Sequence, residues 1–315
     1  MMLSRVAGSL YWMGRYLERA ENVSRLLLVT AEDSSDLEGL DEERARVEWE
    51  QLAEAVPGWN PPPLGQESER RAIACIESLL LDSTSPVSVH STLARARENA
   101  RGVREAVTRE IFENLNEAYQ DLKRRRRFRD RVVALETVVK SHRAILTTLG
   151  AIEHTLSRDQ GWTFMKLGEV MARTLRTLLV LRAKLPGLRS AAGADLPLYY
   201  ARWRSLLRCV ASLENYRRVE GSQVDPDAVV RFLLFDPVAP RSVRCGLARM
   251  KRSIDALPRA STITRPARVA GTLLARIEYN DEEIMEEPNL TPFCDELIQE
   301  IHTLHDALER EYFPS

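Results

Sequence analysis

The chain has 315 residues, of which 44% are hydrophobic and 29% charged, and its formal net charge is −1. Such a composition supports a substantial core, and the near-neutral charge excludes a global field that would attract nucleic acid or a membrane. No apolar run has the length of a membrane span, and charged residues interrupt the N-terminal stretch, so we expect no secretory signal. Four widely spaced cysteines without a Cys-x-x-Cys pair predict reduced thiols in a cytoplasmic protein.

Residues 3–29 are predicted to form the first helix, because apolar residues recur at three- and four-residue steps. A second stripe with the same period is polar, with Arg19 and Glu21 beside it: Tyr11, Arg15, Glu18, Asn22 and Arg25. One interpretation is a solvated face of an amphipathic helix. The other is an enclosed site that binds an anionic or amide-bearing ligand, since guanidinium groups match carboxylate and phosphate geometry.

Helical patterns continue along the chain, and no stretch alternates convincingly as a strand. After an acidic, Ser-rich connection over 30–41, we expect helices over 42–56, 67–81, 87–115 and 129–156, with helical character from 116 to 127. Asp41 is the expected N-cap of the helix over 42–56. The predicted fold class is therefore an all-α helical bundle.

The expected helix over 87–115 carries a further polar stripe. Its candidate binding residues are Arg97, Asn99, Arg101, Arg104 and Glu105. A solvated face is one interpretation. The functional one places Arg101 and Arg104 opposite Glu18 and Arg15, in a pocket with excess positive charge.

The second half of the chain repeats the first at an ungapped offset of 154 residues. Gly14 matches Gly168, Trp49 matches Trp203, and the segment from Leu79 to Arg95 matches the segment from Leu233 to Arg249 at many positions. We infer an internal duplication, with repeats of about 1–156 and 157–315 related by a pseudo-two-fold axis within one domain spanning 1–315.

The two copies differ in their leading helices. Glu18 corresponds to Ala172, and the second leading helix is more apolar, so we expect it deep in the bundle. The polar stripe of the first helix would then have little solvent to face, which favours the enclosed site. Each copy also has an Asp-x-x-x-Pro-x-Ser segment, ending at Ser88 and at Ser242, which predicts a helix start where Ser or Asp accepts from free N–H groups.

Three segments carry a resemblance to a known family. Leu3 to Ala7 with Ser9 to Asn22, Ala96 to Arg101 with Val103 to Glu105, and Phe232 to Leu234 with Pro240 to Val243 resemble three signatures of the alpha-E family. Its members are bacterial all-helical proteins that are associated with circularly permuted ATP-grasp ligases, which make amide or peptide bonds. The resemblance covers nearly all of the chain.

The resemblance implies that this protein works with such an amidoligase in peptide modification. In that role Glu18 or Glu21 would be catalytic. Tyr11, Asn22, Asn99, Glu105, Arg241 and the arginines at 15, 19, 25, 97, 101 and 104 would bind an anionic amino acid, a peptide or an acyl phosphate. ATP and magnesium would come from the ligase, because the chain has no Gly-rich phosphate loop. The alternative is a non-catalytic scaffold that docks or stabilises the ligase, and whether this chain is itself an enzyme is left open.

Other candidate sites are weaker. The basic run from Lys123 to Arg127 with Arg129 could hold RNA or phosphate, but a solvated helix end or a docking site for an acidic partner fits better, so we do not expect nucleic acid. His302 and His305 have metal-ligand spacing without a defined third ligand, and we expect no metal site. A homo-oligomer is left open.

Overall fold

The computed structural model describes residues 2–38, 41–63, 67–190, 196–258, 264–279, 284–285 and 290–314. Within these ranges the chain forms thirteen α-helices and one short 3-10 helix, without a strand, which confirms the predicted all-α class. None of the helices in the described ranges combines the length and the apolar character needed to cross a membrane. The chain divides into two compact units, Ser9–Glu169 and Met1–Gly8 with Val170–Ser315.

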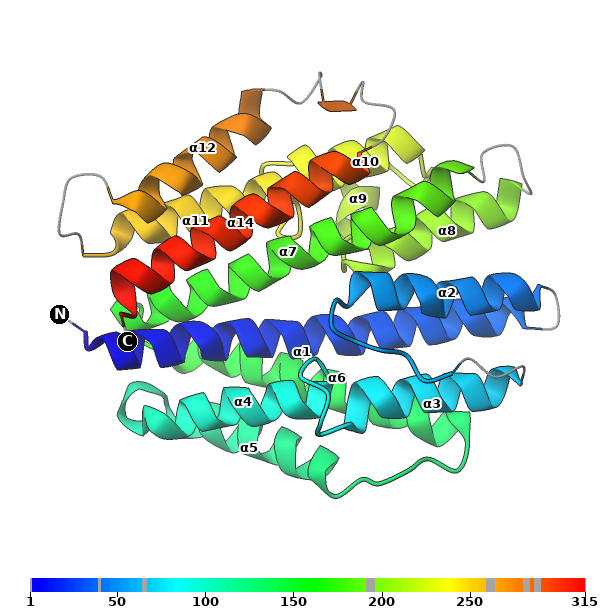
Figure 1. Ribbon diagram of the computed structural model, residues 1–315, viewed down its shortest axis with the longest axis horizontal. Coiled ribbons are helices and arrows are strands. Elements are labelled where there is room, and N and C mark those ends of the chain that lie inside the picture. Colours follow the sequence, from blue (N-terminus) through cyan, green and yellow to red (C-terminus); the bar gives the residue numbers. More distant parts are fainter. Residues whose placement is uncertain are drawn as a thin grey trace. The chain divides into compact units, whose positions relative to one another are not determined.

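The unit Ser9–Glu169 contains most of α1, the helices up to α6, and the first turns of α7. Helix α5 folds back along α4, and both α5 and α3 pack on α6 (Figure 1). The bounds are α1 Ser4–Leu37, α2 Glu42–Ala55, α3 Ser68–Leu81, α4 Val89–Gly102, η1 Arg104–Ala106, α5 Arg109–Lys123, α6 Arg131–Thr155 and α7 Gln160–Ser190.

The unit that holds Val170–Ser315 contains the rest of α7 and the later helices. Helix α12 packs on both α11 and α14, and α10 contacts α8, α9, α11 and α12. On α7, the Thr177 hydroxyl donates to the Arg241 carbonyl at 2.8 Å, which fixes the start of α11. The bounds are α8 Leu196–Cys209, α9 Leu213–Glu220, α10 Pro226–Phe235, α11 Val243–Ala256, α12 Arg265–Tyr279 and α14 Thr291–Tyr312.

The first helix is longer than predicted. The expected connection over 30–41 is wrong, because α1 continues to Leu37. Ala31 and Ser34 are buried, and the Trp49 indole of α2 donates to the Ser34 hydroxyl at 3.1 Å. The guanidinium of Arg131 in α6 donates to the Ala31 carbonyl and pairs with Glu38 at 2.6 Å. Tertiary partners therefore hold residues that read as a polar linker in the sequence.

The expected single helix over 87–115 is also wrong. Helix α4 ends at Gly102, and α5 begins at Arg109 after a short 3-10 turn. The Thr108 hydroxyl accepts from the Ile111 N–H as the new N-cap and is hydrogen bonded to Thr155 at 2.8 Å. A chain reversal thus separates Arg97 and Arg101 from the residues that follow, so the predicted stripe is not one helical face.

The helix bounds match across the two halves of the chain. Helices α2 and α8, and α4 and α11, begin and end 154 residues apart, and α3 and α10 end at that spacing. Where α1 crosses the start of α7, Gly14 lies against the Met165 carbonyl and Gly168 lies against the Tyr11 carbonyl. The same two positions of each copy therefore meet reciprocally, as a local two-fold relation would produce. The duplication itself stays a prediction from the sequence.

The two serines that the sequence assigns to helix starts are N-caps. The Ser88 hydroxyl accepts from the Ser91 N–H at 3.0 Å and donates to the Asp82 carbonyl at 2.6 Å. The Ser242 hydroxyl accepts from the Cys245 N–H at 3.1 Å and donates to the Asp236 carbonyl. The prediction of helix starts at both positions is confirmed.

Ser88→Ala and Ser242→Ala should each lower the free energy of unfolding by about 1 kcal/mol, because each removes a cap and leaves a helix N–H without its acceptor. Urea unfolding followed by circular dichroism measures the change. Ser83→Ala is the matched control, since Ser83 is exposed in the same turn as Ser88. Equal stability of Ser88→Ala and Ser83→Ala would show that the cap contributes nothing.

Candidate functional site: an arginine cluster on α1 and α4

The polar stripe of α1 is largely inside the protein. Tyr11, Glu18 and Glu21 have no exposed surface, Asn22 is 1% exposed and Arg15 is 5% exposed. The interpretation of the stripe as a solvated face is therefore wrong for Tyr11, Arg15, Glu18 and Asn22, and only Arg25 is partly exposed. Burying charges costs several kcal/mol per ion unless they are compensated, so the surroundings of each charge decide what it does.

The two glutamates are held by neighbours one turn away. The Asn22 amide donates to Glu18 Oε1 at 3.4 Å. The Arg25 guanidinium donates through Nε at 2.9 Å and through its terminal nitrogen at 2.5 Å to Glu21 Oε1. Arg25 is partly exposed, with 23% of its side-chain surface accessible. With no exposed surface of their own, Glu18 and Glu21 are placed to orient neighbouring groups rather than to meet a diffusing substrate.

Sequence reasoning missed His142, which joins this network from α6. Its Nδ1 lies 2.9 Å from the Ser24 hydroxyl, whose proton is directed to the Glu21 carbonyl. Its Nε2 lies 3.4 Å from the Arg25 guanidinium and 4.0 Å from Glu21 Oε1. The imidazole therefore packs against the Glu21–Arg25 pair. Ser24 is fully buried, so this contact does not present a nucleophile to solvent.

Arg15 has aromatic rather than acidic neighbours. Its guanidinium carbon lies 5.0 Å from the centre of the Trp12 ring and 5.7 Å from that of Tyr11, and one terminal nitrogen donates to the Tyr11 hydroxyl at 3.2 Å. The Nε–H is buried without a hydrogen-bond partner. Cation–π contacts recover only part of the cost of removing a guanidinium from water. Arg15 is thus a buried cation with no carboxylate beside it among the described residues.

Two further arginines gather near Arg15. The guanidinium carbons of Arg19 and Arg95 lie 6.0 Å and 5.9 Å from the centre of the Tyr16 ring. Burial lowers the pKa of Arg19 below its ordinary value, and the charges of Arg15 and Arg95 lower it further. Within the part of the chain that the structure describes, neither Arg19 nor Arg95 has a carboxylate within ion-pair distance. We call Arg15, Arg19 and Arg95 the arginine cluster.

An open cavity of about 500 Å³ lies beside the arginine cluster, between α1 and α4. Arg95 belongs to both the cluster and the cavity wall, and the Tyr16 ring on which it lies is also part of the wall. The wall consists of Ser9, Tyr16, Ala94, Arg95, Glu98 and Asn99. The guanidinium of Arg95, a phenol and an amide at this cavity suit a ligand that carries carboxylate or phosphate groups. The one carboxylate of the wall, Glu98, is paired with Arg97 and Arg101.

The structure brings only some of the α4 candidates to this cavity. Asn99 lines it, whereas Arg97 donates to Asn116 at 2.7 Å and pairs with Glu98. Arg101 is 65% exposed and lies 3.4 Å from Glu98. Arg104 is exposed and stacks on Phe112 at 3.9 Å, and Glu105 is exposed in η1. Arg241 belongs to the other unit, where its carbonyl accepts from Thr177.

The residues that sequence reasoning missed had a usable signal. Trp12 and Tyr16 alternate with Arg15 and Arg19 along α1, which is the spacing at which rings and guanidinium groups stack. Arg95 lies one turn before Asn99, so the family-like segment of α4 already pointed to that face. The sequence predicted that this segment faces the first helix through Arg101 and Arg104, whereas in the structure Arg95 and Asn99 lie beside Tyr16.

The remaining chemical candidates are isolated. All four cysteines are buried free thiols, and burial raises the pKa of Cys75 and of Cys294 to about 12. Such thiols are poor nucleophiles at neutral pH. His305 lies 3.6 Å from Glu309 on α14. Within the described ranges, no three His, Cys, Asp or Glu side chains are grouped so that they could hold a metal.

The structure defines an all-helical protein whose leading helix carries a buried Glu18 next to a half-buried Arg19. The chain belongs to the Alpha-E family, whose model matches residues 2–313 and is described as a predicted alpha-helical domain with a conserved ER motif. Glu18 and Arg19 form such a pair in α1. No solved structure matches the chain.

Curated relatives occur in mycobacteria. An uncharacterised protein of Mycobacterium bovis is 27% identical over 318 residues, and uncharacterised proteins from two strains of Mycobacterium tuberculosis are 27% and 26% identical. Each alignment covers 96% of this chain and 35% of the relative. The chain therefore spans about a third of the length of the curated relatives that it matches.

Proposed function

We propose that this protein is a helical anion-binding module that acts beside an ATP-grasp ligase in the cytoplasm, and that its arginine cluster holds the acidic group of an amino acid, a peptide or an acyl phosphate. One observation carries the proposal. Arg15, Arg19 and Arg95 gather around aromatic rings without a carboxylate among the described residues. A protein that keeps three such cations together gains most when an anion completes them.

The roles within the module follow from exposure. Arg95 is exposed, Arg19 is half-buried and Arg15 is buried, so the ligand meets Arg95 and Arg19 first, and Arg15 supplies fixed positive charge behind them. Glu18 and Glu21 are positioning residues in this proposal, because their buried side chains hold Asn22 and Arg25. The ligase supplies ATP and magnesium.

Binding of inorganic phosphate, glutamate and acetyl phosphate, measured by isothermal titration calorimetry, tests the proposal. The double variant Arg19→Gln/Arg95→Gln should bind at least one of these probes about tenfold more weakly than the native protein, because two charge-assisted contacts are lost. Arg249→Gln/Arg252→Gln is the matched control and should bind like the native protein, since both side chains are exposed on α11 and neither lines the cavity.

The scaffold alternative predicts a different pattern. A scaffold would leave all probe affinities near zero, and ligase output in a reconstituted mixture would be the same for the native protein and for Arg19→Gln/Arg95→Gln. That pair of results would overturn the anion-binding proposal while leaving an association with a ligase intact.

A further inference from the structure

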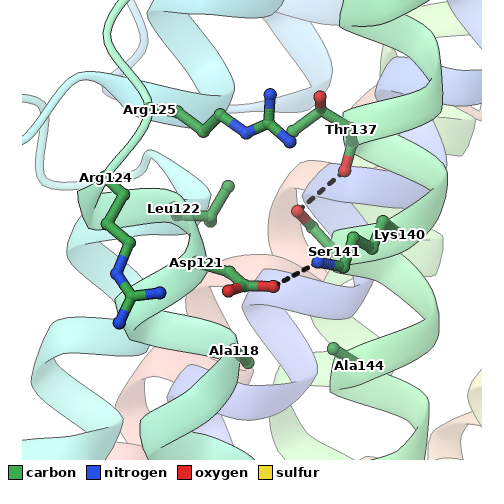
Figure 2. A pocket seen from close by; sticks show the side chains of 9 residues that line it. All are labelled: Ala118, Asp121, Leu122, Arg124, Arg125, Thr137, Lys140, Ser141 and Ala144. Atoms are coloured by element: carbon green, nitrogen blue, oxygen red, sulfur yellow. Dashed lines mark hydrogen bonds and ion pairs between the residues drawn. The ribbon is translucent and has the colours of Figure 1, made fainter.

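A second basic site lies between α6 and the end of α5, where the hairpin formed by α4 and α5 ends. It surrounds a cavity of about 160 Å³, which has room for roughly five water molecules. The wall consists of Ala118, Asp121, Leu122, Arg124, Arg125, Thr137, Lys140, Ser141 and Ala144 (Figure 2). None of these residues belongs to the arginine cluster of α1 and α4.

The charges at this cavity are unbalanced. Lys140 pairs with Asp121 at 2.5 Å, which neutralises that lysine. Arg125 extends from the end of α5 across the cavity toward Thr137 on α6, and Arg124 extends outward past Asp121 (Figure 2). Neither arginine has a carboxylate partner among the described residues, and the same holds for the exposed arginines 126, 127 and 129 that follow. Two of these arginines, Arg124 and Arg125, line the cavity, and the other three follow them in the loop that leads to α6.

The loop that carries these arginines is fixed to the fold. Phe128 is buried, and its backbone N–H donates to Glu77 of α3 at 2.6 Å. Asp130 caps α6 by accepting from the Val133 N–H at 2.9 Å. The loop is thereby held at both of these points while the arginines project outward. A solvated helix end would explain Lys123 and Arg124, because cations stabilise helix C-termini, but it does not explain the arginines beyond the helix.

Exposed apolar side chains follow the arginine loop directly in the chain. Val132 and Val133, in the first turn of α6, are 66% and 37% exposed. Ala118, Leu122 and Ala144 contribute apolar atoms to the cavity wall. A polypeptide with acidic and aliphatic side chains can match both features. A nucleic acid matches only the charge, and with a net protein charge of −1 and one short basic loop it would gain few phosphate contacts.

We propose that the cavity between α5 and α6, with the arginine loop 124–129 and Val132, is a docking site for an acidic peptide segment of a partner protein. Carboxylates of the segment pair with Arg124, Arg125 and their neighbours, and an aliphatic side chain packs on Val132 and at the cavity. The site is independent of the arginine cluster, so either proposal can fail alone.

Fluorescence anisotropy with labelled synthetic peptides tests this site on the full chain. The first probe alternates pairs of glutamates with leucines, the second replaces each leucine by serine, and a single-stranded oligouridylate of equal charge is the third. We expect the Glu–Leu peptide to bind most tightly. Arg124→Ser/Arg125→Ser should weaken it about tenfold, because two exposed ion pairs are lost.

Two further variants distinguish a general effect of charge from binding at this site. Arg249→Ser/Arg252→Ser removes the same charge from an exposed face of α11 and should bind like the native protein. Val132→Ser should reduce the affinity for the Glu–Leu peptide to that for the Glu–Ser peptide. The proposal is overturned if oligouridylate binds more tightly than the Glu–Leu peptide, if no peptide binds, or if Arg124→Ser/Arg125→Ser binds the peptide unchanged.

Discussion

Alanine at Gly14 or at Gly168 should lower the free energy of unfolding by about 3 kcal/mol, because the added methyl group would be forced into backbone that cannot move aside easily. A Cβ on Gly14 would lie 3.0 Å from the Met165 carbonyl carbon and closer still to its oxygen. A Cβ on Gly168 would lie 2.9 Å from the Tyr11 carbonyl carbon. The two helices touch through backbone here, so either substitution must separate them.

Urea unfolding of the two variants measures the effect, and Gly150→Ala is the matched control. Gly150 lies inside α6 with no atom within 4 Å of an added Cβ, so alanine there should raise the stability by about 0.5–1 kcal/mol through helix propensity alone. Because the control should raise the stability and the two test variants should lower it, a general effect of Gly→Ala substitution cannot explain the difference. If Gly14→Ala unfolds at the same urea concentration as the native protein, the close crossing of α1 and α7 is wrong.

Gly168→Ala has a second expected consequence that Gly14→Ala lacks. Its Cβ would lie 3.2 Å from Cγ of Arg15, which is tighter than ordinary van der Waals contact. The Arg15 side chain would be displaced from its place on the Trp12 ring. Phosphate affinity should therefore fall further for Gly168→Ala than for Gly14→Ala at equal loss of stability.

The sequence was informative where one helix or one turn decides the outcome. The caps at Asp41, Ser88 and Ser242 are local, since a side chain accepts from an N–H three residues later. The cap at Asp41 and the two later helix starts were predicted correctly, and the structure selects Ser over Asp at both starts. The matched glycines at 14 and 168 were visible as part of the repeat, but the sequence did not show why glycine is needed there. Each glycine lies against a backbone carbonyl group of the crossing helix, and no pattern within either helix indicates that contact.

The sequence misled where tertiary contacts override a local pattern. Val132 fits the apolar period of the predicted helix over 129–156, yet it is exposed, and the buried face of α6 includes the polar residues Thr137, Ser141 and His142. Ser141 and Thr137 satisfy their hydroxyls on carbonyl groups one turn back, which makes polar residues acceptable inside. A count of apolar residues cannot anticipate that choice. Similarly, Arg19 shares the Tyr16 ring with Arg95, which carries the same charge. A search of the sequence for pairs of opposite charge would not find this arrangement.

Removing the charge of Arg25 and removing the charge of Arg15 should change the free energy of unfolding in opposite directions. Arg25→Met should lower the free energy of unfolding by about 2 kcal/mol, because it leaves the buried Glu21 carboxylate without its nearest cation, an effect reduced by the partial exposure of Arg25. Arg15→Met should instead raise it by about 1 kcal/mol, since it removes a buried guanidinium with an unsatisfied Nε–H and relieves repulsion from Arg19. Urea unfolding without added anion measures both.

Added phosphate then links stability to binding. At a phosphate concentration about a hundred times the dissociation constant, the free energy of unfolding of the native protein should rise by about 2.7 kcal/mol. That of Arg15→Met should rise markedly less, so the variant should no longer be more stable than the native protein. A protein that retains Arg15 at a cost in stability without ligand, and recovers that cost when an anion binds, is using the residue for binding. Should Arg15→Met prove as destabilising as Arg25→Met, stacking on Trp12 and Tyr11 outweighs the cost of burial, and the arginine cluster is a structural feature of α1.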